Sequence, residues 1–392
     1  MKVCIGVKNL NPYSGKRTAT LDLLLHGGKA PSWLLRRMKR LGRIISEIII
    51  TEFGIDEFLI RLSDPLWFQA FAYVLGYDWD SSGVTTVLSG VLKSVLNEDL
   101  GILVAGGKGK RSLDAPNEIK KIGEIFGFSQ KTIQDFVRIS KLVAKVDNAL
   151  IQDDHQLYHH TIFISRKKDW IVIQQGMNVR EKTARRYHWS STNLKSFVVE
   201  PHTGILGDNK LPFVLDLTSS KSLEAQKISI DLIKDGVNVI RRDLSKLNAL
   251  KNRNMTLDSY FINQQIKLPN MKHIHIRFLP RRVNWEALKK AYEISPKTFE
   301  EFVEIEGIGP GTLRALALVA ELIYDANVSW VDPIRYTFAH GGKDGIPYPV
   351  NVKRMETVIE KLEDILEDLK INKREKADML KRLSKLLPRR KP

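Results

Sequence analysis

The chain has 392 residues, and its 62 lysines and arginines outnumber its 45 aspartates and glutamates, which gives a formal net charge of +17 at pH 7. The single Cys4 excludes an internal disulfide framework and a cysteine-cage metal site, and the absence of a long apolar run or a leader pattern predicts a soluble, cytoplasmic protein with no membrane partner. A positive surplus of this size favours nucleic acid as the partner, although lysine and arginine enrichment is also a stability trait of thermophile proteins.

Residues 1–146 are expected to form a helical N-terminal domain, one of two or three domains in a chain of this length. Apolar periodicity predicts helices over 32–49, 56–62, 87–96, 117–127 and 131–145, and a buried aromatic segment over 66–75. The first helix carries a run of basic residues behind Trp33. Three of them are predicted to contact phosphates, namely Arg36, Arg37 and Arg40.

Two polar, glycine-containing stretches interrupt the helical periodicity of this region. The polar stretch GYDWDSSGVTT carries Asp78, Asp80 and Ser82 as a secondary candidate catalytic group, because loops often carry chemistry. The stretch AGGKGKR at 105–111 is predicted to be a mobile basic loop, and it lacks the spacing of a nucleotide P-loop.

Residues 147–270 are expected to form a β-rich central region. LYHHTIFIS and DWIVIQQGMN, separated by a charged turn at 166–168, predict an antiparallel hairpin. Alternation places Tyr158 with His160 on one face and His159 with Thr161 on the other.

Histidines and carboxylates are dense in this region. The set comprises His155, His159, His160, His188, His202, Asp153, Asp154 and Glu200. From it we expect a Mg²⁺ or Mn²⁺ site with Asp153, Asp154, His160 and Glu200 as ligands. His159 is expected as a further acid or base group, and His188 as a catalytic residue that clamps phosphate together with Arg185 and Arg186. Structural histidines bonded to the backbone are the alternative for each histidine taken singly.

ARRYHWSS mixes cations with aromatic residues. Arg185 and Arg186 would pair with phosphates, while Tyr187 and Trp189 would stack on unpaired bases. A basic strand edge with aromatic residues in the core explains the same pattern equally well.

Residues 271–392 contain the most informative stretch, which joins helices predicted over 299–305 and 313–324. Gly307, Gly309, Gly311 and Thr312 form a turn whose amides open the second helix, with Pro310 at a position that needs no N–H. Such amides bind phosphate oxygens, whereas a glycine that merely ends a helix is the structural alternative. EFVEIEGIGPGTLRALALVAELI resembles the helix-hairpin-helix element of DNA repair proteins, which implies binding to a DNA backbone. A later helix over 352–369 would serve as a self-association surface, giving a homodimer, or as a lid.

RLSDPLWFQAF, DWDSSGVTT, LYHH, WIVIQQGMN and ARRYHW together resemble a prokaryotic domain-of-unknown-function family, number seven-six-three. The resemblance implies an archaeal or bacterial protein and brings no agreed activity.

The segment behind the hairpin also resembles the endonuclease III-like glycosylases, which implies a sugar-stabilising role for Asp332. Here Gly311 replaces their lysine, and a helix N-cap is the alternative role of Asp332. His160 and Gly176-x-Asn178 are similar to the layout of phospholipase D-like nucleases, with Ile162 in place of a lysine.

We therefore expect an α+β protein with mainly helical N- and C-terminal domains around a small antiparallel β-rich middle region. The leading functional hypothesis is a DNA-binding, DNA-repair-type, metal-dependent nuclease. The alternatives are an abasic-site lyase or glycosylase using Lys93 or Lys108, and a non-catalytic DNA-binding or scaffold protein.

Overall fold

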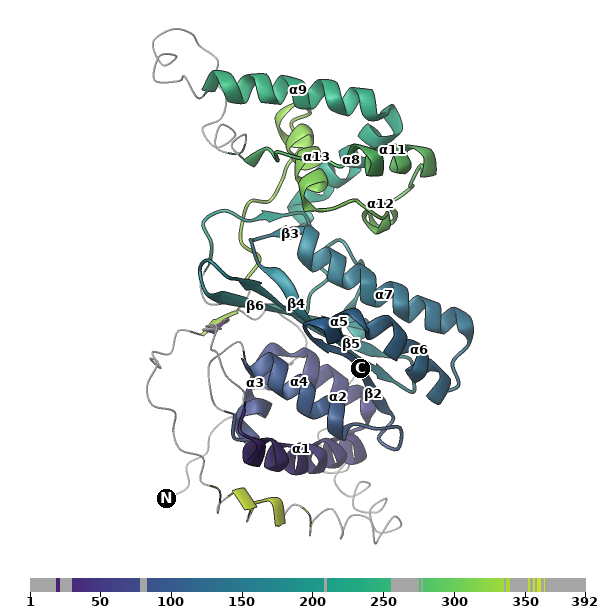
Figure 1. Cartoon of the computed structure of the whole chain (residues 1–392), viewed down its shortest axis with the longest axis vertical. Coiled ribbons are helices and arrows are strands. Elements are labelled where there is room, and N and C mark those ends of the chain that lie inside the picture. The colour runs from purple at the N-terminus through teal and green to yellow at the C-terminus, as the bar shows by residue number, and fades with distance from the viewer. Residues whose placement is uncertain are drawn as a thin grey trace, which may run out of the picture.

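The structure is a computed structural model, and it describes residues 19–21, 30–77, 83–207, 210–254, 275, 278–334, 336–338, 352, 355, 356, 358–360 and 363. Helices α1 to α4 lie at one end of the molecule, a sheet with α5 to α7 lies in the middle, and α8 to α13 lie at the other end (Figure 1). Asp78, Asp80 and Ser82 lie outside the described residues, as does most of the helix predicted over 352–369.

The N-terminal helices follow the predicted periodicity closely. They are α1 (Ser32–Phe53), α2 (Ile55–Ser63), α3 (Pro65–Val74) and α4 (Gly83–Val95). Helix α3 begins where Asp64 accepts a hydrogen bond from the amide of Leu66 at 2.7 Å, with Pro65 at the first helical position. Their apolar sides form one core with one face of the sheet, including Phe163, Ile171 and Ile173.

The sheet has seven strands in the order β1-β9-β7-β6-β5-β4-β2. The strands are β1 (Ala19–Leu21), β2 (Ile102–Lys108), β4 (Gln156–Ser165), β5 (Trp170–Asn178), β6 (Thr183–Ser190), β7 (Gly204–Gly207) and β9 (Tyr336–Phe338). Strands β2 to β7 pair antiparallel, whereas β9 joins β7 and β1 in parallel. The short strands β3 (Ile151–Gln152) and β8 (Leu215–Asp216) form a second sheet. The predicted hairpin is β4–β5, with Lys168 in the turn at φ 75°.

A β-bulge in β4 corrects the predicted alternation. The register with β5 shifts between Leu157 and His159. Tyr158 consequently accepts a hydrogen bond from Gln175, whereas His160 bonds Gln174 on the opposite face. The prediction that Tyr158 and His160 share a face was wrong because a bulge re-aims the side chain at the extra residue.

The stretch at 105–111 is another correction, since it is ordered strand and helix. Strand β2 runs to Lys108 and α5 (Lys110–Leu113) follows. Gly106 has φ +91°, and a Cβ there would lie 2.1 Å from the carbonyl oxygen of His160. Lys93 donates a hydrogen bond to the carbonyl of Gly106 at 2.6 Å, and the amide of Gly106 donates one to Glu118 at 2.6 Å. The glycines therefore let β2 pass close to β4.

The remaining helices cover the other face of the sheet and build the far end of the molecule (Figure 1). They are α6 (Ala115–Ile125), α7 (Gln130–Ala149), α8 (Leu223–Asp235), α9 (Val237–Asn254), α11 (Trp285–Ile294), α12 (Phe299–Glu304) and α13 (Pro310–Leu322), with 3₁₀ turns η1 (Ser191–Asn193) and η2 (Ser220–Ser222). One hydrophobic core runs from α7 and the sheet into α13. The architecture is α+β, and the sheet draws strands from all three predicted ranges, 1–146, 147–270 and 271–392.

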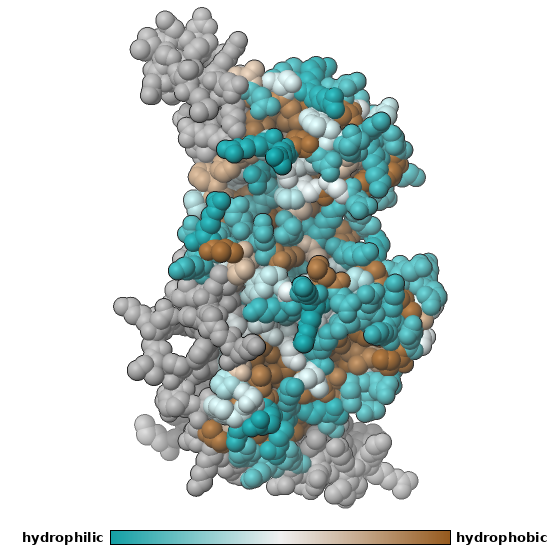
Figure 2. Space-filling view, in the orientation of Figure 1, coloured by the Kyte–Doolittle hydropathy of each residue, from teal (hydrophilic) through white to brown (hydrophobic). Residues whose placement is uncertain are grey.

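Hydrophilic residues dominate the face shown in Figure 2, where apolar residues are scattered. Among the described helices, none is long and apolar enough to cross a lipid bilayer.

Candidate nucleic-acid interface

The connection between α12 and α13 lies at the surface. Gly307 and Pro310 are exposed, and Gly309 and Gly311 are half-buried. A hollow of about 360 Å³ opens there, lined by Arg282, Val283, Asn284, Gly307, Gly309, Pro310, Gly311 and Thr312. The loop predicted from sequence thus forms a concave surface beside an arginine.

The amides at the start of α13 face no carbonyl of their own helix. Pro310 occupies the first helical position, and the first backbone bond of the helix runs from the amide of Leu313 to the carbonyl of Gly309 at 3.0 Å. The amides of Gly311 and Thr312 therefore belong to the set that a helix leaves without intrahelical partners, at the positive end of its dipole. This arrangement suits an oxyanion.

The three glycines of the loop differ in whether the surrounding structure requires a residue without a Cβ. Gly307 has φ +84°, and a Cβ there would lie 2.9 Å from Nδ2 of Asn284. A Cβ on Gly311 would lie 2.9 Å from the carbonyl oxygen of Arg282. Gly309 has φ −128°, and no atom lies within 4 Å of where its Cβ would stand. The described fold therefore explains the glycines at 307 and 311 and leaves the one at 309 unexplained.

Side chains from α7 and β3 hold both ends of the loop. Lys145 on α7 donates to the carbonyl of Ile305 at 2.6 Å, and Gln152 donates to the carbonyl of Pro310 at 2.8 Å. Arg314 donates in turn to Gln152 at 2.5 Å. Burial lowers the pKa of Lys145, an effect that nearby glutamates partly oppose. The loop is thus fixed from the sheet side before any ligand arrives.

A second hollow, of about 570 Å³, lies between α6, α7 and the end of α12. It is lined by Lys120, Glu124, Gln130, Ile133, Gln134, Val137, Arg138, Lys141, Leu142, Lys145 and Glu304. Arg138 forms ion pairs with Glu300 and Glu304 on α12. Because Lys145 lines this hollow and also bonds the loop, the two concave surfaces flank the same segment.

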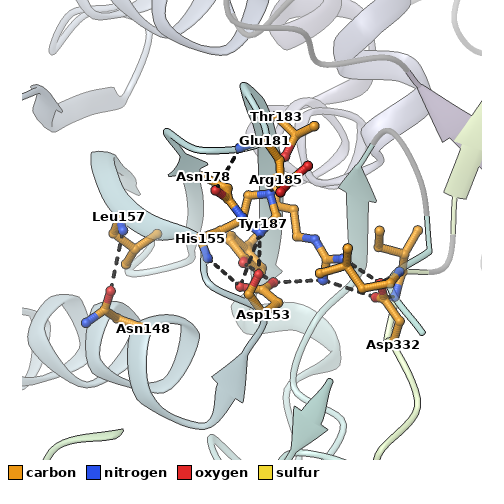
Figure 3. A network of polar contacts seen from close by, with 12 residues as sticks. Asn148, Asp153, His155, Leu157, Asn178, Glu181, Thr183, Arg185, Tyr187 and Asp332 are labelled. Atoms are coloured by element: carbon orange, nitrogen blue, oxygen red, sulfur yellow. Dashed lines mark hydrogen bonds and ion pairs between the residues drawn. The ribbon is translucent and has the colours of Figure 1, made fainter. Parts of the chain in front are cut away.

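The predicted catalytic residue Asp153 and the predicted nucleic-acid contacts Arg185 and Tyr187 belong to one sealed ion-pair network (Figure 3). Arg185 donates to Asp153 at 2.7 Å and forms two bonds with Asp332, at 3.0 and 2.5 Å. Tyr187 donates to Asp153 at 3.0 Å, and the backbone amide of His155 donates to it at 2.9 Å. Burial would raise the pKa of Asp153, but Arg185 and His155 outweigh burial and lower it to about 2.

Asp332 is therefore neither a helix N-cap nor an open catalyst. It is 4 % exposed, and besides Arg185 it accepts hydrogen bonds from the amides of Leu211 and Ile334. Arg185 is 1 % exposed and Tyr187 is fully buried. A role for these residues in surface contacts to phosphates or bases does not fit, since the core encloses them.

A neighbouring network links His160 to α7. His160 donates from Nδ1 to Gln174 at 2.7 Å, which leaves Nε2 to accept from Ser140 at 2.8 Å. Gln174 and Trp189 both donate to the same oxygen of Asp147, and His202 contacts its other oxygen at 2.5 Å. Burial lowers the pKa of His160, so its ring is neutral at physiological pH.

The predicted metal ligands do not converge. Asp153 and His160 belong to the two separate networks, Asp154 is exposed with φ 63°, and Glu200 accepts a hydrogen bond from the amide of Ser220 at 3.2 Å. No group of three metal-ligating side chains occurs within the ranges that the structure describes. These residues are close in the sequence, but His160 lies on β4 whereas Asp153, Asp154 and Glu200 lie on bends outside the strands, so their surroundings differ.

The basic helix α1 is partly neutralised. Arg37 lies 2.7 Å from Glu356, and Arg40 lies 3.1 Å from both Glu356 and Glu363. Arg36 is exposed. The predicted phosphate contacts at Arg37 and Arg40 therefore compete with carboxylates that follow in the C-terminal part of the chain.

Comparison with known proteins gives one family. The model for a protein of unknown function, DUF763, matches residues 19–350. The chain belongs to this family. No curated protein and no solved structure matches it.

For this DUF763 chain, sequence reasoning missed the residues that hold the loop. Lys145, Gln152 and Asn284 lie far from 305–312 in sequence, so no local motif marks them. Lys93, considered above as a Schiff-base amine, is committed to Glu118 and to Gly106 at 2.6 Å. The loop and the two helices around it were predicted from local pattern.

Proposed function

We propose that this protein binds nucleic acid, DNA in the first instance, through the loop between α12 and α13. The observation that carries the proposal is Gly309. It is a glycine in an ordinary extended conformation with open space in front of it, within a hollow that Arg282 also lines. A residue without a Cβ that the fold does not require is expected where a foreign backbone comes close.

The chemistry of the hollow suits a phosphodiester. The amides of Gly311 and Thr312 can donate to phosphate oxygens, and the α13 dipole and the charge of Arg282 favour an anion. Lys145 and Gln152 hold the carbonyls at both ends of the loop, so little ordering is needed on binding. Such contacts read the backbone and carry no base sequence.

Substitution of Gly309 by Asp tests the proposal. Aspartate is a better helix N-cap than glycine, so stability should be kept or slightly raised. Its Cβ and charge would stand where the phosphate binds, and we expect at least a tenfold loss of DNA affinity. Fluorescence anisotropy with labelled single-stranded and duplex DNA over a salt series measures this effect. The control is Gly90→Asp, an exposed glycine on α4 with open space around it and the same change in charge.

Equal binding by the two variants, or no salt-dependent binding by the wild type, would overturn the proposal. The Gly309→Ser variant separates the steric effect of a side chain on DNA binding from the effect of its charge, because serine is also a good helix N-cap but is neutral. If Ser at this position weakens binding as well, close approach is required in addition to electrostatics.

The nuclease predicted from sequence stays a proposal, and the same DNA panel tests it. Cleavage that requires Mg²⁺ or Mn²⁺ and stops with a chelator supports a metal-dependent nuclease. A borohydride-trapped adduct on abasic DNA supports the lyase instead. Tight binding with no product on any DNA form supports a non-catalytic DNA-binding protein.

A further inference from the structure

A row of polar side chains crosses the sheet on the face that packs against α3 and α4. Backbone register places Lys108 of β2 beside His159 of β4, His159 beside Gln175 of β5, and Gln175 beside Arg186 of β6. Neighbours in register have Cβ atoms about 5 Å apart. We call these four residues, Lys108, His159, Gln175 and Arg186, the polar row.

The polar row lies against both polar and apolar residues: Thr85 of α4 donates a hydrogen bond to Gln175, and Gln69 of α3 accepts one from Arg186. Phe163, Ile171 and Ile173 lie on the same face and belong to the core shared with the N-terminal helices. His159 and Arg186 are 1 % and 0 % exposed. Polar groups buried in such a place cost free energy unless each is satisfied, so a polar row here calls for a reason other than packing.

Several buried atoms at the polar row have no hydrogen-bond partner among the described residues. They include Nδ1 of His159 and Nε2 of Gln69, the α3 residue whose Oε1 accepts a hydrogen bond from Arg186 at 2.9 Å. An amide nitrogen can only donate, so the group missing beside Gln69 is an acceptor. Each unsatisfied buried group costs about 1–3 kcal/mol.

The polar row reaches the surface at one end. Lys108 is exposed and its ammonium lies 5.8 Å from the ring centre of Tyr158. The β-bulge turns half-buried Tyr158 toward this end, where its hydroxyl accepts from Gln175. Bulges that re-aim a side chain in this way are frequent next to active sites.

Nearby cations act on two buried histidines at the polar row. Burial, then His160 and Lys108, lower the pKa of His159 to about 3. Burial and then Arg186 hold the pKa of His188, which packs against Phe68 of α3, well below its ordinary value. Both histidines are therefore neutral hydrogen-bonding groups beside cations, a setting that would favour a bound anion.

We propose that the polar row is an oxyanion site that takes a phosphoryl group, with Lys108 at its entrance and Gln69 and Arg186 as donors within. The site is separate from the α12–α13 loop and does not depend on the function proposed above. The phosphoryl group belongs to a free nucleotide or to the end of a nucleic-acid strand.

Isothermal titration of the full chain with inorganic phosphate, a nucleoside 5′-monophosphate, and oligonucleotides with and without a 5′-phosphate tests the site. We expect phosphate to bind and Lys108→Ala and Gln69→Leu each to weaken binding at least fivefold. Lys227→Ala, which removes an exposed lysine on α8, should bind as the wild type does. Binding of the 5′-phosphorylated but not the unphosphorylated strand identifies a strand end, whereas preference for the monophosphate identifies a free nucleotide.

Because Gln69 is buried, circular dichroism must show that Gln69→Leu is folded, and exposed Lys108 provides the independent variant. No phosphate binding, or equal binding by the Lys108→Ala and Lys227→Ala variants, overturns the proposal. Loss of phosphate binding in Gly309→Asp but not in Lys108→Ala overturns it too, since the anion would then occupy the loop. Intact phosphate binding with no binding of DNA would leave the polar row standing and remove the loop proposal.

Discussion

The α12–α13 loop and the Asp153–Arg185–Asp332 network form an instructive contrast. The loop contains no titratable side chain between Gly307 and Thr312, yet its backbone is exposed and concave. The network holds the charges that catalysis commonly uses, yet Arg185 is 1 % exposed and both carboxylates are paired with it. In this protein the charged side chains of the network are therefore buried structural groups. The candidate binding surface is formed mainly by exposed backbone.

The physical reason lies in what each region leaves unsatisfied. Every oxygen of Asp332 accepts at least one hydrogen bond from within the chain, and Arg185 joins two carboxylates. Among the described residues, the amides of Gly311 and Thr312 at the start of α13 have no backbone acceptor and are left for solvent or a ligand. A binding site is better sought where partners are missing than where charges are abundant.

Breaking the network should produce the largest effect on stability. In Arg185→Met, Asp153 and Asp332 would remain buried without a cation, which is expected to cost about 3–5 kcal/mol. Urea denaturation at pH 7 measures the loss, and Tyr187→Phe, which removes one hydrogen bond to Asp153, should cost about 1 kcal/mol. If the Arg185→Met protein is as stable as the wild type but no longer binds DNA, the network has a functional role and the distinction between a structural network and a binding loop is wrong.

A pH series sharpens the same contrast through Asp216, a buried carboxylate that forms no ion pair with a lysine or arginine among the described residues. Burial raises its pKa to about 6, despite hydrogen bonds from Thr218. Between pH 4 and 6 the folded protein holds more protons at this site than the unfolded chain, so its contribution to stability falls as the pH rises. The full change is up to about 3 kcal/mol. Denaturant midpoints across this window should fall less steeply for Asp216→Asn than for the wild type.

A smaller effect is expected where α7 meets the loop. Lys145→Met would remove the donor to the carbonyl of Ile305, so we expect about a fivefold loss of DNA affinity, equivalent to about 1 kcal/mol. Lys141→Met removes the same charge from the same hollow, and Lys141 is exposed. Similar losses in the two variants would show that charge alone matters and that Lys145 does not position the loop.

Local pattern predicted much of the secondary structure. The periodicity of 32–49 predicted α1, and the charged turn at 166–168 predicted the β4–β5 hairpin, because both signals depend on neighbouring residues. Strand β2 was missed because its glycines suggested a loop. The reason for them, the close carbonyl of His160, lies more than fifty positions away in sequence.

The candidate site was less predictable. The loop at 307–312 was found from its glycines, but their differing roles became clear only when Asn284 and Arg282 were placed against them. Adjacent residues such as Arg185 and Arg186 point to opposite faces of β6, so a single motif supplies both the sealed network and the polar row. The sequence alone does not show which face of the sheet each arginine occupies. The register of β6 with β5 and β7 does.

The parallel pairing of β1 with β9 also limits how early the sheet can be completed during protein synthesis. Ala19 pairs with Tyr336, near opposite ends of the chain. Contacts of such high sequence separation slow folding, and during synthesis the edge of the sheet stays open until the ribosome has released almost the whole protein. A truncated product lacking either strand should therefore expose an unpaired strand edge and aggregate.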